Sequence, residues 1–133
     1  MKRLKKNFRI ELSQKSRGPW KTFGVGSHVQ YVAYYEDVEI GNISVFKYGK
    51  RVYVNTVFIK TNYRGNGFGY RLYEFALQQH GCLSTFYFSA SDDAKRVWKK
   101  LIKKYRHETD FFKETLTIYC VDDKLLVKSA ASL

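Results

Sequence analysis

Three glycines at alternate positions, Gly65, Gly67 and Gly69, mark the part of this 133-residue sequence that is best suited to bind a ligand. An apolar, strand-like run ends at Ile59, shortly before the glycines, and a helical pattern of apolar residues begins at Phe68. In a strand, tight turn and helix of this kind, successive backbone N–H groups and the positive end of the helix converge on one point. The sequence therefore predicts an anion-binding site at this turn.

The spacing of the glycines excludes two nucleotide-binding motifs. A Rossmann turn that began at Gly65 would need a sixth-position glycine, but Tyr70 stands there. A Walker P-loop needs GK[ST] after four intervening residues, and the sequence has none. The RNA-binding RNP1 pattern matches at four positions but requires aromatic residues at Asn66 and Arg71. RNP1 is also a strand motif, whereas these residues open a helix, so a plain RNA-binding domain is kept only as an alternative.

The glycine pattern that fits is Arg-x-x-Gly-x-Gly, and with its flanks it resembles the acetyl-CoA-binding signature of the GNAT family of N-acetyltransferases. The family form is roughly V-x-P-x-[YF]-[RQ]-G-x-G-x-G-x-x-L, and Thr61 in place of the proline is the departure from it. The matching residues are Ile59, Tyr63, Arg64, Gly65, Gly67, Gly69 and Leu72.

The resemblance extends from about residue 28 to residue 105. Family members carry N-x-x-A-x-x-[FL]-Y-x-x-L at the helix that follows the next strand. This chain has Ser91, Ala94, Val97, Trp98 and Leu101 in that frame. The stretch before residue 28 is shorter than the two helices that are usual in the family.

The resemblance implies that acetyl-CoA, or another acyl-CoA, is the cofactor. The backbone N–H groups of residues 65–70 would hold its pyrophosphate, because glycines let the main chain approach a phosphate closely. The end of the preceding strand would pair with the pantetheine arm, and a backbone N–H there would polarise the thioester carbonyl. The residues implied to contact the cofactor are Phe58, Ile59, Arg64, Gly65, Asn66, Gly67, Phe68, Gly69, Tyr70, Ser91 and Trp98.

Other residues occupy the positions that usually serve catalysis in the family. Making an acceptor lysine neutral at pH 7 costs about 4 kcal/mol, and many members supply a Glu before the turn and a Tyr acid on the later helix. Tyr53 stands where some members carry the Glu, and Trp98, which cannot protonate a thiolate, stands at the Tyr position. The catalytic residues are therefore unassigned, with Asn55, Ser91 and Tyr105 as candidates; helical spacing also allows Tyr105 to be a core aromatic.

The activity that the resemblance implies is transfer of an acetyl group from acetyl-CoA to a primary amine by direct attack of the amine. The acceptor would be a protein, a small molecule or an aminoacyl-tRNA. The alternative is a catalytically weak or inactive module that keeps the GNAT fold and contacts protein or nucleic acid through basic residues.

A strand before the turn and a helix after it must position the glycines. Residues 28–59 predict an antiparallel meander with strands at 28–35, 38–46 and 51–59 and a bulge at Gly41. The helix begins at Phe68 and ends at Gly81. The next strand is expected at 83–90, and a right-handed crossover makes it parallel to the strand before the turn.

The remaining segments complete a single domain. They comprise a strand at 8–12, a loop or one helical turn at 13–27, a helix at 92–105 capped by Ser91, and strands at 115–121 and 125–127. The predicted fold is α+β and GNAT-like, with a mostly antiparallel sheet and one parallel strand–helix–strand crossover at the cofactor turn. Its parts are 8–27, a short strand and loop; 28–59, the meander; 60–105, the turn, helix, strand and helix; and 106–128, the C-terminal strands.

The chain carries 24 basic and 12 acidic residues, and its net charge of +12 creates a long-range positive field. Such a field suits nucleic acid, an anionic cofactor or an acidic protein. One face of the helix at 92–105 concentrates this charge and is either solvated or a contact for such a partner. Its residues are Lys95, Arg96, Lys99, Lys100, Lys103 and Lys104.

Several other features bear on the class of protein. Cys82 and Cys120 lie outside any CxxC motif and are expected to be reduced thiols, and His28, His80 and His107 are too dispersed to suggest a metal site. The basic N-terminus lacks the apolar segment of a signal peptide, and no run is long enough to span a bilayer. We expect a cytoplasmic protein with neither a metal nor a membrane partner.

Overall fold

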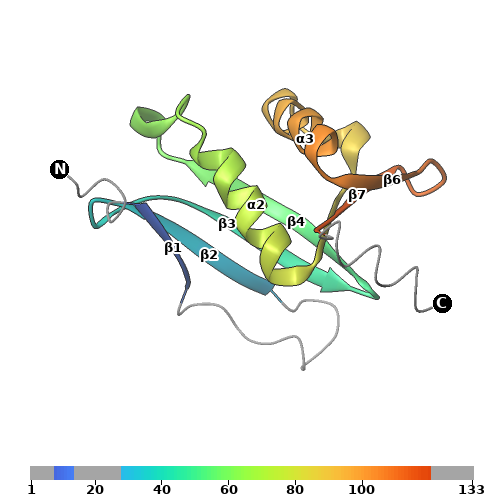
Figure 1. The fold of residues 1–133 in the computed structure, drawn as a ribbon, viewed down its shortest axis with the longest axis horizontal. Coiled ribbons are helices and arrows are strands. Elements are labelled where there is room, and N and C mark those ends of the chain that lie inside the picture. Colours follow the sequence, from blue (N-terminus) through green and yellow to red (C-terminus); the bar gives the residue numbers. More distant parts are fainter. Residues whose placement is uncertain (1–7, 14–27, 121–133) are drawn as a thin grey trace.

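The computed structural model describes residues 8–13 and 28–120, which form one seven-stranded sheet with two α-helices (Figure 1). The sheet order is β1-β2-β3-β4-β5-β7-β6, and every neighbouring pair is antiparallel except β4 and β5. The predicted α+β fold with one parallel crossover is confirmed. The strands are β1 (Phe8–Leu12), β2 (His28–Tyr35), β3 (Val38–Tyr48), β4 (Arg51–Ile59), β5 (Cys82–Thr85), β6 (Arg106–Asp110) and β7 (Thr115–Tyr119), and the helices are α2 (Phe68–His80) and α3 (Asp92–Lys104).

The meander of β2, β3 and β4 forms as predicted, with β3 two residues longer. Glu36 and Asp37 make the two-residue turn between β2 and β3, and both have positive φ, as the tightest hairpin turns require. A register shift opposite Ala33 and Tyr34 leaves Ile40 as the extra residue, directly beside Gly41. The meander therefore has its bulge one residue before the predicted position.

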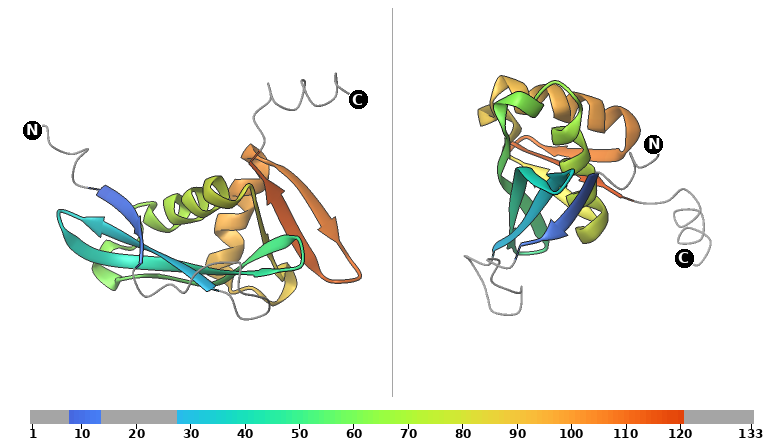
Figure 2. Two further views of the ribbon diagram at one scale, coloured as in Figure 1. Left: turned by 90° about the horizontal axis from the view of Figure 1, so that it is seen from below. Right: turned by 90° about the vertical axis from the view of Figure 1, so that its left-hand side faces the viewer.

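The hydrophobic core lies between one face of the sheet and both helices. Figure 2 shows α2 lying along the long strands of the meander, and α3 stands beside it. Alternate residues of β3, β4, β5 and β7 point into this core, as the two-residue period of a strand requires. The largest of its fully buried side chains are Ile40, Ile43, Val45, Leu72, Leu77, Leu83, Trp98, Leu101 and Ile118.

The strand predicted at 83–90 is wrong in its second half. β5 ends at Thr85, and the next residues form a short 3-10 turn, η3 (Tyr87–Ser89), before α3 begins. The run of aromatic and β-branched residues favours a strand. Beyond Thr85, however, β4 has moved away on one side and β7 begins at Thr115 on the other. The segment lacks the ladder partners that a longer strand needs.

β6 was missed because its sequence carries no strand signal. All five of its residues, Arg106 to Asp110, are exposed, so the apolar alternation of a half-buried strand is absent. β6 pairs only with β7, at the edge of the sheet, and forms because the hairpin partner is present. The expectations for residues 14–27, 121 and 125–127 lie outside the described residues.

Candidate functional site

A cleft opens where the two parallel strands part. β4 and β5 share a single ladder pair, Tyr53 with Ser84, and then diverge. The cleft has a volume of about 760 Å³, and residues 54–59 of β4 form one wall. The glycine turn and the first turns of α2 line it next, and the start of α3 closes the opposite side.

A second bulge shapes the β4 wall. Val54 pairs with Val45 and Thr56 with Ser44, so Asn55 is the extra residue between them. Both Asn55 and Thr56 are exposed, and both hydrogen-bond to Ser44 Oγ, Thr56 at 2.8 Å and Asn55 Nδ2 at 3.4 Å. Since a bulge bends its strand, this one accompanies the divergence of β4 from β5. Asn55, a catalytic candidate, lies on the cleft wall.

The glycine turn leaves the positive end of α2 without a side-chain cap. Gly65 and Gly67 have φ values of 82° and 81°, a left-handed conformation that favours glycine, although a Cβ at either would meet no atom within 4 Å. Gly67 is the N-cap residue of α2, and the first turn has no acidic residue. The first N–H groups of a helix have no intrahelical acceptor, and the residues that begin α2 line the cleft.

Two polar side chains hold the turn in shape. Arg64 donates from Nε to the carbonyl oxygen of Ile59 at 2.7 Å, which ties the turn to the end of β4. Asn66 donates from Nδ2 to the carbonyl oxygens of Tyr63 and Arg64, at 3.2 and 3.4 Å. Arg64 lines the cleft, but Asn66 does not. The structure therefore gives Asn66 a role in supporting the loop.

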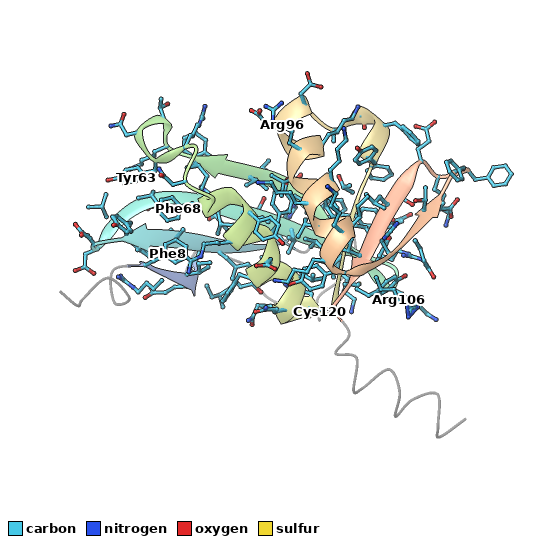
Figure 3. All side chains as sticks on the ribbon, turned by 45° about the horizontal axis from the view of Figure 1, so that its top comes forward. Phe8, Tyr63, Phe68, Arg96, Arg106 and Cys120 are labelled. Atoms are coloured by element: carbon cyan, nitrogen blue, oxygen red, sulfur yellow. The ribbon has the colours of Figure 1, made fainter. Side chains whose placement is uncertain are left out.

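Aromatic rings anchor the start of α2 to the sheet. Phe68 stacks on Phe8 of β1 with ring centroids 5.1 Å apart, and it also contacts Tyr35 and Tyr63 (Figure 3). Phe8 and Tyr35 are partners in the β1–β2 ladder. The edge of the sheet thus fixes the helix end whose N–H groups face the cleft.

The start of α3 supplies charge to the other side of the cleft. Ser91, which was predicted both as a catalytic candidate and as a cofactor contact, accepts a hydrogen bond from the backbone N–H of Ala94 at 3.1 Å and caps the helix. Arg96 and Lys100 both line the cleft, and Arg96 also pairs with Asp93. Among the described lining residues, Asp93 is the single carboxylate, and no histidine is present. With Arg64, the cleft walls carry a positive balance.

Besides Asn66, two predicted site residues lie outside the cleft lining. Trp98 is 1% exposed and packs edge-to-face on Tyr73, with ring centroids 5.6 Å apart, so its assignment to cofactor contact has no support in the geometry. Tyr105 donates its hydroxyl proton to Glu74, and burial, followed by this hydrogen bond, raises its pKa to about 12. Both residues lie where α2 and α3 pack together, away from the cleft lining.

Sequence reasoning missed Tyr73. It follows Leu72 in the buried stripe of α2 and is 4% exposed, yet it lines the cleft. Burial raises its pKa to about 12. The one feature of the sequence that could have drawn attention to this residue is that it is a tyrosine, whereas the other buried residues of α2 are aliphatic. The remaining predicted cofactor residues, from Phe58 to Tyr70 apart from Asn66, all line the cleft.

The described residues contain no cluster of three or more side chains suited to hold a metal ion. In the same part of the chain, no helix has the length and apolar character needed to cross a membrane. Cys82 and Cys120 are free thiols.

Residues 26–104 match a family model described as an acetyltransferase (GNAT) domain. Comparison with curated proteins gives no match. Among solved structures, a Bacillus subtilis acetyltransferase in complex with CoA aligns with a TM-score of 0.60 at 16% identity, covering 86% of this chain and 99% of that one. A GNAT family acetyltransferase from Elizabethkingia anophelis with acetyl-CoA bound gives 0.59 at 12% identity with the same coverage. A Pyrococcus horikoshii chain, with a TM-score of 0.49 at 20% identity, matches 60% of this chain, which spans 28% of that one.

Proposed function

The chain belongs to the GNAT acetyltransferase family, and we propose that it transfers the acetyl group of acetyl-CoA to a primary amine. One observation carries the proposal: the uncapped N-terminus of α2, presented by a glycine turn, opens onto a cleft with Arg96 and Lys100 on its far side. The structures from Bacillus subtilis and Elizabethkingia anophelis hold CoA and acetyl-CoA in the same fold. Their ligands support acetyl-CoA as the cofactor here.

The residues present fit the parts of this cofactor. The N–H groups of Phe68, Gly69 and Tyr70 would bind the pyrophosphate, aided by the dipole of α2. Arg96 and Lys100 would neutralise further phosphate charge. Residues 54–59 of β4 have no ladder partner on the β5 side, so their backbone groups are available to an extended arm that adds like a strand.

The bound acetyl-CoA would supply a thioester carbonyl that a neutral amine attacks. None of the described residues that line the cleft is suited to act as a general base. The one carboxylate among them, Asp93, forms an ion pair with Arg96. We therefore propose that water takes the proton of the attacking amine. A protein, a small molecule and an aminoacyl-tRNA all remain proposed acceptors.

The experiment is calorimetric titration of acetyl-CoA into the full chain and into Gly67→Asp. The carboxylate would face the pyrophosphate, so we expect affinity to fall by at least about 100-fold, or about 2.7 kcal/mol. Gly49→Asp is the matched control. Gly49 also has positive φ, at 63°, and open space around it, but it lies in the β3–β4 turn and outside the cleft lining. Equal affinities in all three proteins would refute the proposed cofactor site.

The absence of a base among the described cleft residues favours a second candidate, a module that binds acetyl-CoA without turnover. Its basic surface would be the exposed lysines of α3, such as Lys99 and Lys103. Incubating the protein with acetyl-CoA and a panel of peptides, polyamines and aminoacyl-tRNA separates the two candidates. Acetylated product supports the transferase, and saturable binding without product on any acceptor supports the module.

A further inference from the structure

The turn between β6 and β7 carries two exposed phenylalanines. Phe112 is 99% exposed and Phe111 is 75% exposed, which makes them the two most exposed large apolar side chains of the described chain. The β6–β7 hairpin projects at one end of the molecule, beside α3 (Figures 1 and 2). Large apolar side chains that gather in contact with solvent mark a site for a partner.

Hydrogen bonds to Asp110 shape this turn. Asp110 Oδ1 accepts from the backbone N–H groups of Phe112 and Lys113, both at 3.1 Å. A carboxylate that bonds to the backbone two residues further on forms an Asx turn. Glu114 completes the turn with a positive φ of 57°, and Thr115 then pairs with Asp110 in the ladder. The two rings therefore project from a turn of defined geometry.

Two further exposed rings, those of Phe86 and Phe88, lie at the same end of the sheet. They are 49% and 53% exposed. Thr85, the residue before them, pairs with Leu116 at the start of β7, and η3 contacts β7. The four rings account for half of the eight exposed large apolar side chains among the described residues. We call them the aromatic patch: Phe86, Phe88, Phe111 and Phe112.

A row of three lysines on α3 begins beside this patch. Lys95, Lys99 and Lys103, the lysine row, are four residues apart, so they follow one side of the helix at intervals of about 6 Å along its axis. Lys95 Nζ lies 5.6 Å from the ring centroid of Tyr87, which contacts Phe88 edge-to-face at 6.0 Å. The structure gives none of the three lysines an ion pair with a described residue.

The lysine row lies outside the proposed cofactor cleft. Arg96 and Lys100 line the cleft, and Lys104 bonds to Glu74 of α2. Each member of the lysine row precedes one of these three residues, and successive residues of a helix are turned by about 100° around its axis. The basic face of α3 is therefore divided: one side faces the cleft and α2, and the other carries the lysine row.

We propose that the aromatic patch and the lysine row form a docking surface for single-stranded nucleic acid. Unpaired bases stack on exposed aromatic rings, and a line of cations follows their phosphates. The interval of about 6 Å between the lysines is close to that between successive phosphates of an extended strand. The net charge of +12 also attracts a polyanion.

The arrangement of the charges favours a strand over a lipid surface. The cations form a line that leads away from the rings along α3, whereas a lipid surface would be met by cations around the rings. The proposal goes beyond acetyl transfer and does not depend on it. If the wild-type protein fails to bind acetyl-CoA, the proposed function is overturned and the docking surface is not.

Fluorescence anisotropy with a labelled single-stranded RNA tests the rings. Phe112 is almost fully exposed, so Phe112→Ala should fold normally. We expect it to lower RNA affinity by at least about fivefold, the effect of losing one stacked base. Phe112→Leu keeps an apolar side chain without an aromatic ring and should lose as much, whereas Phe112→Trp should retain binding. Leu12→Ala is the control, since Leu12 is 59% exposed on β1, at the opposite edge of the sheet from β6.

Salt dependence tests the lysine row. Each phosphate that a protein neutralises on a single strand contributes about 0.7 to the slope of log affinity against log salt concentration. Lys99→Gln should reduce the slope by about that amount, and the double variant with Lys103→Gln by about twice as much. Lys60→Gln removes the same charge from an exposed lysine ahead of the glycine turn and should leave the slope unchanged.

Three further probes identify the ligand. Heparin offers negative charge without bases, so Phe112→Ala should bind it as tightly as the wild-type protein does. The same sequence as single-stranded DNA distinguishes the two sources of unpaired bases, and tighter binding of either supports the surface. Binding to phosphatidylserine vesicles that Phe112→Leu retains, with no affinity for RNA or DNA, would overturn the proposal in favour of lipid. Wild-type RNA affinity in Phe112→Ala, or equal slopes in Lys99→Gln and Lys60→Gln, would also overturn it.

Discussion

Gly41 and Phe58 approach so closely across the β3–β4 ladder that a Cβ on Gly41 would lie 2.3 Å from the Phe58 carbonyl oxygen. Phe58 belongs to the β4 wall of the cleft. The glycine therefore sets the position of the strand that faces the proposed cofactor, from a site that does not line the cleft.

We expect Gly41→Ala to lower the free energy of unfolding by about 1–3 kcal/mol, because the backbone of β4 must shift to admit the methyl group. Acetyl-CoA affinity should fall with it. Gly69→Ala is the comparison for stability, since its Cβ would lie 3.9 Å from Ile59 Cγ1, an ordinary contact. Thermal unfolding of both variants provides the measurement, and equal stabilities would show that β4 relaxes freely.

Lys100 and Lys103 test the charge of the cleft. Both lie on the exposed side of α3, but only Lys100 lines the cleft. Lys100→Gln should weaken acetyl-CoA binding by about three- to tenfold at low salt, and the difference should shrink as salt screens it. Lys103→Gln removes the same charge and should change affinity less than about twofold. Equal losses in both would mean that the overall field of the protein attracts the cofactor.

Glu74 joins the two helices behind the cleft. It accepts hydrogen bonds from Tyr105 Oη and, at 2.8 Å, from Lys104 Nζ. Burial raises its pKa, but the hydrogen bonds from Lys104 and Tyr105 outweigh burial, so the pKa lies below its ordinary value of 4.5. A lowered folded-state pKa contributes stability above the unfolded-state value, and this contribution is lost as the pH falls through the folded-state value.

Glu74→Gln should therefore cost about 0.5–1 kcal/mol of unfolding free energy at pH 7. Urea unfolding as a function of pH provides the measurement, and the gap from wild type should close as the pH falls below the ordinary value of 4.5 and through the lowered pKa of Glu74. Glu39→Gln, at an exposed carboxylate without an ion pair in the described residues, should show no gap at any pH. A gap for Glu74→Gln that persists at low pH would contradict the ionic explanation.

The parts of the fold that local chemistry governs could be predicted from the sequence. The glycines indicated the tight turn, and helical spacing placed α2 and α3 to within one residue at their ends. The meander could be predicted from the alternation of apolar and polar residues in its strands and from the turn residues between them. In contrast, the end of β5 at Thr85 depends on where β4 and β7 lie, and β6 exists only because β7 offers it a partner.

Local φ requirements and glycine spacing determined the helix N-terminus at Gly67, since both concern consecutive residues. Only the tertiary structure decided which tyrosines line the cleft: Tyr63, Tyr70 and Tyr73 do, and Tyr105 does not. Tyr73 and Tyr105 occupy equivalent places in the sequence pattern, each on an apolar stripe of its helix. Tyr73 lines the cleft, whereas Tyr105 donates its hydroxyl proton to Glu74 of α2, because packing between distant segments sets where each side chain lies.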